Sequence, residues 1–164
     1  MADNPARNRR RGAWRDPLGD AEYHALGQFR RSFREFMAFS ESGAYEHDIS
    51  GQQHQALLAI RAHSGPEPMS IGELADCLMI KNHSAVGLVD RMVERGLVVR
   101  LVSEADRRRV LLSLTREGQV ILSEISVKNL GRLSETGKIL SELIRTVRRL
   151  ERRGLWARRG KKDD

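Results

Sequence analysis

The stretch from Ser70 to Gly118 constrains the fold of this chain more than any other part. It reads as a short helix, a tight turn, a second helix and two short strands around an arginine-rich loop. Ser70 and Glu73 form a capping box at the start of the first helix, and Met79–Lys81 makes the turn. Elements in this order form a winged helix-turn-helix, which places one helix in the DNA major groove and the hairpin beside the backbone.

The second helix, expected over about residues 82–95, has the clearest amphipathic pattern. Its apolar residues share one narrow face, namely Ala85, Leu88, Val89 and Met92. Gly96 is expected to end this helix. Residues 97–102 and 110–114 then predict the two strands of the hairpin, with a charged tip between them.

A helix precedes this unit over about residues 19–42, and Gly43 is expected to end it. Ser50 and Gln53 form a second capping box, which opens a helix running to about residue 62.

A long helical region follows the hairpin. Thr115 is expected to cap it, Thr136-Gly137 to break it, and Arg153 to lie near its end. Both flanking regions carry apolar stripes: Leu26, Phe29, Phe33, Phe36 and Met37 in the first, and Val120, Ile121, Ile125, Leu130, Leu133, Leu140, Leu143, Ile144, Val147 and Leu150 in the second. Because a small central unit is not expected to bury these stripes fully, we expect them to pack against each other and against a second copy in a two-fold dimer; a monomeric helical bundle is the alternative.

Composition favours a nucleic-acid partner. The 164 residues suffice for one domain with its own core, and the formal net charge of +7 is concentrated near the two ends. Nucleic acid is favoured over a membrane as the polyanionic partner, and basic ends that only maintain solubility are the alternative. The chain has no apolar run of the roughly 18 residues that span a bilayer, no secretory pattern and one cysteine, so we expect a cytoplasmic protein.

The expected fold is mainly α with a small β-hairpin wing: a winged helix-turn-helix flanked by N- and C-terminal dimerisation helices. The segments are a basic arm without regular structure (1–16), an N-terminal dimerisation region (17–48), a DNA-binding domain (49–118), C-terminal dimerisation helices (119–153) and a basic tail (154–164).

Candidate DNA contacts lie on the second helix of the pair. They are Lys81, Asn82, His83, Ser84, Val86, Gly87 and Arg91. Polar side chains at the helix start suit base edges, and Val86 suits a thymine methyl group. Gly87 permits a close approach, and Arg91, one turn further, suits phosphate. Plain solvation of the helix surface is the alternative for each residue.

The hairpin tip carries Asp106 followed by Arg107, Arg108 and Arg109. Adjacent arginines on a projection are costly unless an anion neutralises them, and arginine enters narrow minor grooves. We therefore expect the tip to bind DNA, with Asp106 pairing with one arginine and shaping the turn. A solvated charge run is the alternative.

These motifs resemble the MarR family of bacterial transcription regulators. The wing signature D-R-R-x-x-x-L-x-L-T-x-x-G is matched by Asp106-Arg107-Arg108, Leu112, Leu114, Thr115 and Gly118. The end of the family's recognition helix is similar to residues Leu88-Val89-Asp90-Arg91-Met92-Val93-Glu94-Arg95-Gly96-Leu97-Val98 of this chain. The start of the family's second helix is similar to Ile49-Ser50-x-x-Gln53. Gly87 departs from the family pattern, in which an arginine is common.

The resemblance implies a homodimer that binds a pseudo-palindromic operator in double-stranded DNA, usually as a repressor. It also implies DNA release when a small, frequently phenolic or aromatic, effector binds between the dimer helices and the DNA-binding lobe. The family architecture suggests that His47 or His54 lies near that effector.

The sequence gives little indication of an enzymatic, metal or redox site. We see no nucleophile elbow, phosphate-cradling glycine loop or paired carboxylates in a cleft, so we expect neither an enzyme nor a cofactor. The histidines (His24, His47, His54, His63 and His83) lack ligand-like spacing, so no metal site is expected. Cys77, expected to be half-buried, has no adjacent cation or resolving partner, and we expect no redox role for it.

The sequence thus predicts a ligand-responsive, dimeric transcriptional regulator, most often a repressor in this family. The alternatives are a non-specific architectural nucleic-acid binder that uses the basic ends, and a winged-helix module that holds a partner protein.

Overall fold

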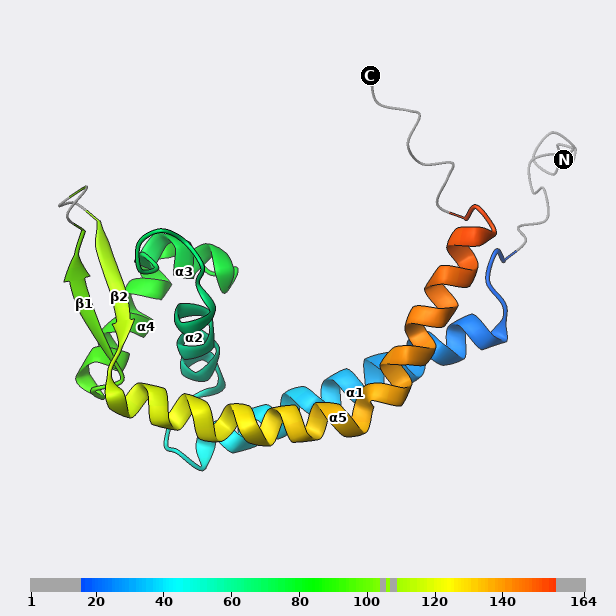
Figure 1. The fold of residues 1–164 in the computed structure, drawn as a ribbon, viewed down its shortest axis with the longest axis horizontal. Coiled ribbons are helices and arrows are strands. Elements are labelled where there is room, and N and C mark those ends of the chain that lie inside the picture. Colours follow the sequence, from blue (N-terminus) through cyan, green and yellow to red (C-terminus); the bar gives the residue numbers. More distant parts are fainter. Residues whose placement is uncertain (1–15, 104–105, 107–108, 156–164) are drawn as a thin grey trace, which may run out of the picture. The chain divides into compact units, whose positions relative to one another are not determined.

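The computed structural model describes residues 16–103, 106 and 109–155. In chain order the elements are α1 (Asp20–Tyr45), α2 (Gly51–Ala62), α3 (Ile71–Cys77), α4 (Asn82–Glu94), β1 (Val98–Val102), β2 (Val110–Leu114) and α5 (Arg116–Arg152) (Figure 1). The strands form one antiparallel hairpin. The predicted fold class, mainly α with a β-hairpin wing, is confirmed.

Both predicted capping boxes are present. At α2, the Gln53 amide donates to Ser50 Oγ at 3.2 Å, and the Ser50 amide donates to Gln53 Oε1 at 2.8 Å. At α3, the Glu73 amide donates to Ser70 Oγ at 3.3 Å, and the Ser70 amide donates to Glu73 Oε2 at 2.7 Å. Each box satisfies two amides that would otherwise lack a partner at a helix start.

The turns on either side of α4 use the left-handed backbone region. Met79, in the turn between α3 and α4, has φ 53°, and the Ile80 amide donates to Ala75 O at 3.0 Å. Gly96 has φ 70° after α4, as its predicted role in ending the helix requires. The predicted helix-turn-helix is therefore formed by local backbone geometry.

The hairpin is tied to the connection before α3. Strands β1 and β2 pair with Val98 opposite Leu114 and Val102 opposite Val110. The Leu112 amide donates to Met69 O at 2.8 Å, so the segment before α3 lies alongside β2. Thr115 caps α5 as predicted, because its Oγ1 accepts from the Gly118 amide at 3.0 Å.

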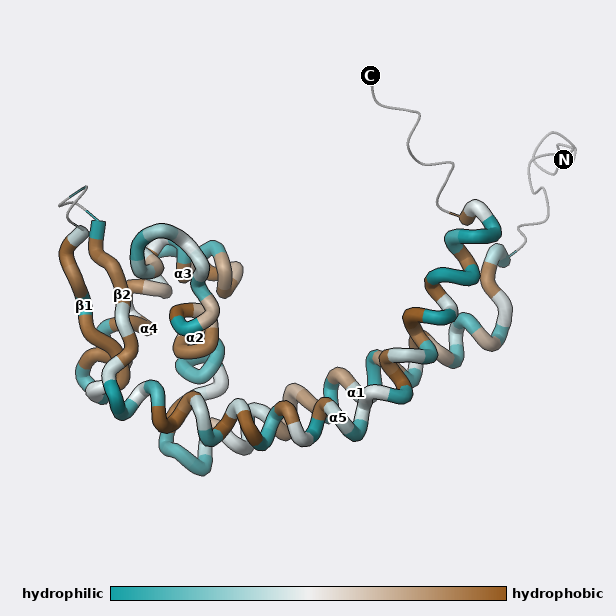
Figure 2. The backbone as a smooth tube through the Cα atoms, in the orientation of Figure 1, coloured by the Kyte–Doolittle hydropathy of each residue, from teal (hydrophilic) through white to brown (hydrophobic). Residues whose placement is uncertain are grey.

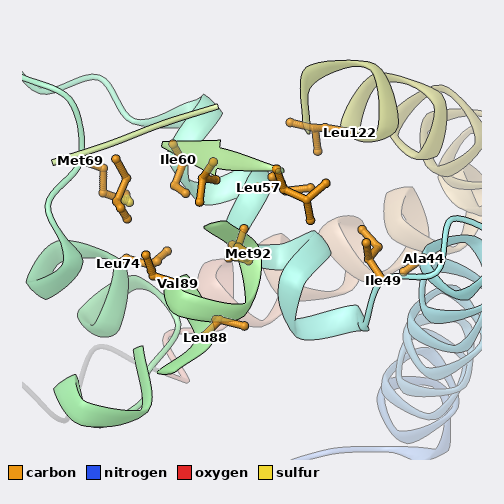
Figure 3. Packing of buried hydrophobic residues seen from close by; sticks show 14 of the residues in the cluster. Ala44, Ile49, Leu57, Ile60, Met69, Leu74, Leu88, Val89, Met92 and Leu122 are labelled. Carbon is orange, nitrogen blue, oxygen red and sulfur yellow. The ribbon is translucent and has the colours of Figure 1, made fainter. Parts of the chain in front are cut away.

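A continuous core holds the helix pair, the hairpin and the start of α5 together. Figure 3 shows Leu57 of α2, Leu74 of α3, Met92 of α4 and Leu122 of α5 in one cluster. All of the apolar residues predicted for the buried face of α4 are buried: Ala85, Leu88, Val89 and Met92. The core thus fixes which face of α4 points away from the protein.

The chain divides into two compact units. One comprises the described parts of Met1–Phe33 and Thr136–Asp164, in which Glu22 Oε1 lies 3.6 Å from Arg149 Nη1. The other is Arg34–Glu135, which contains the winged helix-turn-helix together with the second half of α1 and the first half of α5.

The predicted end of the first helix at Gly43 is wrong. The α1 helix continues to Tyr45, and Gly43 is buried. A Cβ at Gly43 would lie 3.8 Å from Ile125 Cγ2, so this glycine lies at the contact between α1 and α5. The chain turns instead at Asp48, which has φ 55°, and the Ile49 amide donates to Ala44 O at 3.2 Å.

The predicted break at Thr136-Gly137 is also wrong, because α5 is one continuous helix of 37 residues. Ser141 Oγ donates to Gly137 O at 2.8 Å within the helix. A single glycine costs a helix interior about 1 kcal/mol relative to alanine, which does not stop a long helix whose other residues favour it.

The predicted apolar stripes of α1 and α5 are only partly buried within the chain. Figure 2 shows hydrophobic residues recurring among hydrophilic ones along both helices. Ile125 and Leu150 are buried, whereas Phe33, Val120 and Leu130 are 53%, 49% and 67% exposed. The terminal helices therefore present substantial apolar surface.

Candidate nucleic-acid interface

The exposed face of α4 carries most of the predicted contacts. Asn82, His83 and Ser84 form its first turn and are exposed, and Val86 is exposed beyond them. Lys81 occupies the N-cap position without a side-chain hydrogen bond to the helix. An uncapped helix start with polar side chains suits both base edges and phosphate oxygens.

Two arginines hold α4 in place from behind. Arg100 of β1 donates to Asp90 Oδ1 at 2.6 Å, which joins the hairpin to the helix. Arg95, at the C-terminal end, donates to the carbonyl oxygens of His47 and Asp48, each at 3.3 Å. Because α4 is anchored at its middle and its end, its first turn is presented in a fixed orientation.

Gly87 lies on the partly exposed face of α4, where close packing does not require a glycine. Among the described residues, and apart from the backbone of α4 itself, a Cβ at this position would meet Arg91 Nη1 alone, at 3.7 Å. The glycine therefore leaves room on the same surface as Arg91, one turn further along the helix.

The wing residue Arg109 is engaged by the protein itself. Its Nη1 lies 3.3 Å from Glu67 Oε2, and its Nη2 lies 3.3 Å from Glu73 Oε2. Asp106 is bonded at both sides of the turn: its carbonyl accepts from the Arg109 amide at 2.9 Å, and its amide donates to Ser103 Oγ at 3.2 Å. Arg107 and Arg108 lie outside the described residues.

A hollow of about 340 Å³ lies between the start of α3, α4 and the base of the wing. It is lined by Ser70, Ile71, Gly72, Asn82, Val86, Arg109 and Val110. The structure thus brings together three predicted site residues, Asn82, Val86 and Arg109. It adds the start of α3, which the sequence interpretation did not include although its capping box was recognised.

Sequence reasoning also missed a buried polar cluster in the unit Arg34–Glu135. Ser40 of α1 accepts from Asn129 Nδ2 of α5 at 3.0 Å, and its Oγ lies 3.5 Å from His54 Nδ1 of α2. His54 Nε2 and Asn129 Oδ1 are buried and have no hydrogen-bond partner among the residues that the structure describes. Burial lowers the pKa of His54 below its ordinary value, so its imidazole is held neutral.

The corner between α1 and α2 contacts both α5 and the end of α4. On one side, Lys128 Nζ of α5 lies 2.6 Å from Glu46 Oε2, and Glu124 Oε2 lies 3.6 Å from His47 Nε2. On the other side, the corner carbonyls accept from Arg95 at the end of α4. The hydrogen bond from Lys128 lowers the pKa of the Glu46 carboxyl, which keeps this pair charged.

Cys77 is exposed, so the expectation that it is half-buried is wrong. It is the last residue of α3, whose buried face is carried by Leu74 and Ala75. Within residues 16–103, 106 and 109–155 no group of His, Cys, Asp and Glu is placed to hold a metal ion. In the same part of the chain, none of the helices combines the length and hydropathy needed to cross a membrane.

The helix pair, the hairpin and the exposed first turn of α4 define a winged helix-turn-helix protein. A model of the MarR family matches residues 47–109. These residues, which include most of the winged helix-turn-helix, are thus similar to a family of transcription regulators. Among related proteins, the transcriptional regulator PecS of Dickeya dadantii is 28% identical over 80 residues, which span 49% of this chain and 48% of PecS.

Solved structures show the same fold. A mutant of MepR from S. aureus, bound to an oligodeoxyribonucleotide, superposes with a TM-score of 0.59 at 20% identity, covering 78% of this chain and 97% of that one. BpsR of Bordetella bronchiseptica, whose DNA binding is regulated by 6-hydroxynicotinic acid, superposes with a TM-score of 0.55 at 20% identity, covering 83% and 98%.

Proposed function

We propose that this chain is a dimeric, ligand-responsive repressor that binds a pseudo-palindromic operator, with α4 in the major groove. One observation carries the proposal: the first turn of α4 presents Asn82, His83 and Ser84 to solvent while its opposite face is locked into the core. Asparagine, histidine and serine can each hydrogen-bond to base edges. The anchoring of α4 by Asp90–Arg100 supports it, because base readout requires a fixed helix.

The apolar surface of the terminal helices supports a dimer. Val127 and Leu130 of α5 are more than half exposed in the protomer, as is Phe33 of α1. Burying such side chains against a second copy stabilises the pair by the hydrophobic effect. A two-fold dimer would present two recognition helices to successive major grooves, roughly 34 Å apart. Acting on chromosomal DNA, the dimer would work in the cytoplasm.

The buried polar cluster and the α1–α2 corner support ligand control. His54 Nε2 and Asn129 Oδ1 offer polar groups that a small aromatic effector with a hydroxyl or carboxyl group could satisfy. An effector that moved α5 would act on Glu46 and His47, and through their neighbouring carbonyls on Arg95 and α4. The control of BpsR by 6-hydroxynicotinic acid is a precedent in a protein of the same fold. Release of DNA then follows from different effector affinities of two dimer conformations.

The direct test is selection of bound duplexes from a random-sequence DNA pool, followed by fluorescence anisotropy on the selected site with unrelated competitor DNA. We expect a two-fold symmetric site and a preference of roughly 10³-fold or more over unrelated DNA. Asn82→Ala and His83→Ala should each weaken binding to that site by roughly tenfold. Gln55→Ala, at an exposed position of α2, is the matched control and should bind as the unaltered protein does.

The other outcomes are equally informative. Binding that unrelated DNA abolishes would contradict an operator-specific regulator and indicate an architectural nucleic-acid binder. An absence of DNA binding at low salt would remove the proposal and favour a protein-interaction module.

A further inference from the structure

Arg109 was expected, from its place in the run of arginines, to contact DNA, but its surroundings indicate a different task. Its guanidinium lies between two carboxylates from outside the hairpin, each 3.3 Å away: Glu67 in the connection before α3, and Glu73 in the first turn of α3. One positive and two negative charges make this group net negative. The side chain of Arg109 is 42% exposed and its guanidinium keeps further N–H donors, but a phosphate that approached it would be repelled by both carboxylates.

Glu67 also holds the opposite side of the wing. Its Oε1 accepts from Ser103 Oγ at 2.7 Å, while its Oε2 accepts from Arg109. Ser103 follows β1 and Arg109 precedes β2, and the Ser103 amide donates to Arg109 O at 3.2 Å. A single carboxylate therefore binds both sides of the base of the wing loop. Ser103 is only 1% exposed, so its hydroxyl has this bond in a nearly dry environment.

Glu73 connects the same arginine to the start of the helix-turn-helix. Its Oε2 accepts from the Ser70 hydroxyl at 2.6 Å and from the Ser70 amide at 2.7 Å, as part of the capping box. These hydrogen bonds hold the pKa of the Glu73 carboxyl below its ordinary value, so it stays ionised beside Arg109. The position of the carboxylate is thus set by the helix start, not by a flexible side chain alone.

We propose that Arg109 is a positioning residue: with Glu67, Glu73 and Ser103 it forms a wing latch that fixes the hairpin against α3 and thereby against the recognition helix. The inference rests on the proposed DNA-binding function and assigns Arg109 a role within it. The latch keeps the wing at one distance from α4, so that both elements meet the same duplex in register. Arg109 then affects DNA binding by positioning the hairpin, without itself contacting DNA.

The first test asks whether neutralising Glu67 strengthens or weakens operator binding. If Arg109 were a phosphate contact, Glu67→Gln would remove a repulsive charge, free the arginine and strengthen binding. The wing latch predicts the opposite: Glu67→Gln and Arg109→Ala should each weaken operator binding roughly threefold or more, the range of a partly exposed ion pair. Glu94→Gln, an equal charge change at an exposed position of α4, is the control and should not weaken binding.

Arg109→Lys separates the two roles further. A lysine supplies the same charge to a phosphate but has one nitrogen, which cannot reach two carboxylates as the guanidinium does. We expect this variant to bind as weakly as Arg109→Ala. Binding equal to the unaltered protein, or stronger binding by Glu67→Gln, would overturn the wing latch.

Amide hydrogen exchange tests the latch without DNA. Arg109→Ala should speed exchange of the Ser103 and Asp106 amides, which are bonded across the base of the loop, with an unchanged melting temperature as evidence of intact folding. Unchanged exchange at both amides would contradict the latch. If the unaltered protein bound no DNA, the proposed function would fail, while exchange would still decide whether Arg109 holds the wing.

Discussion

At the scale of single residues, Gly118 and Gly87 show two different reasons for a glycine. A Cβ at Gly118 would lie 2.2 Å from the carbonyl oxygen of Leu97, a backbone atom that cannot move aside cheaply. A Cβ at Gly87 would lie no closer than 3.7 Å to the Arg91 side chain. The first glycine is required by the fold, whereas the second leaves space on the surface proposed to meet DNA.

Replacing Gly118 by alanine should therefore destabilise the protein. The added methyl group would push the start of α5 away from the hairpin, at a cost of about 1–3 kcal/mol. Urea unfolding of Gly118→Ala would measure this loss. Gly137→Ala is the matched control, because no atom lies within 4 Å of a Cβ there, and it should be neutral or stabilising. Equal stability of the two variants would contradict the close contact at Gly118.

Gly87→Ala should separate stability from DNA binding. Alanine favours a helix interior over glycine by about 0.5–1 kcal/mol, so thermal unfolding should shift upward. If α4 enters the major groove, the new methyl group should at the same time weaken operator binding measured by anisotropy. A variant that is more stable and binds DNA equally well would show that this face of α4 does not approach the bases.

At the scale of elements, the contact between α1, α2 and α5 contains His54 as a buried base. Its folded pKa is lowered by burial, so below the ordinary value of 6.5 the unfolded chain binds a proton that the folded chain resists. Stability from this group is therefore present above that pH and is lost as the pH falls through it. The pKa of two carboxyl groups, Glu46 and Glu73, is also lowered in the folded protein. Their contribution to the pH dependence of stability falls in a separate pH range, below their ordinary pKa of 4.5.

His54→Leu should accordingly flatten the pH dependence of stability. Between about pH 7.5 and pH 5.5 the unaltered protein should lose stability, by at most about 1.4 kcal/mol per pH unit for this one proton. The leucine variant should lose less over the same range. Urea unfolding at a series of pH values measures the difference, and parallel curves for the two proteins would show that His54 is not responsible.

At the scale of the whole molecule, the apolar faces of α1 and α5 are not fully buried by the chain itself. Leu130 is 67% exposed although it belongs to the apolar stripe recognised in the sequence. Scattered apolar residues are ordinary at surfaces, and a repeated exposed stripe on the terminal helices is the observation behind the proposed dimer. The proposed occupant is a second copy of the chain.

Leu130→Glu should weaken that dimer, because a charge would be buried where a leucine side chain packs. Sedimentation equilibrium should show more monomer at a given concentration, with at least a roughly tenfold rise in the dissociation constant. Val99→Glu, the same kind of change at an exposed position of β1, should leave the dimer intact. A monomeric unaltered protein, or equal effects of the two substitutions, would contradict a dimer built by α5.

Most of the fold could be predicted from short sequence patterns. The capping boxes at Ser50 and Ser70, the stripe of α4 and the left-handed Gly96 each depend on residues within a few positions of one another. Such features form wherever the sequence allows, so they could be predicted without knowledge of the rest of the chain. The candidate contacts on the first turn of α4 followed from the same periodicity.

The features that the sequence did not predict depend on contacts between segments far apart in the chain. Gly43 lies inside α1 beside Ile125 of α5. The fold also brings Glu67 and Glu73 to Arg109, which is the basis of the proposed wing latch. The cluster of Ser40, His54 and Asn129 likewise joins three helices. The sequence by itself determined which elements form and which face of each is apolar, because those depend on short-range geometry. Only the tertiary structure decided which charges neutralise one another, because ion pairs depend on distances in space and not on spacing along the chain.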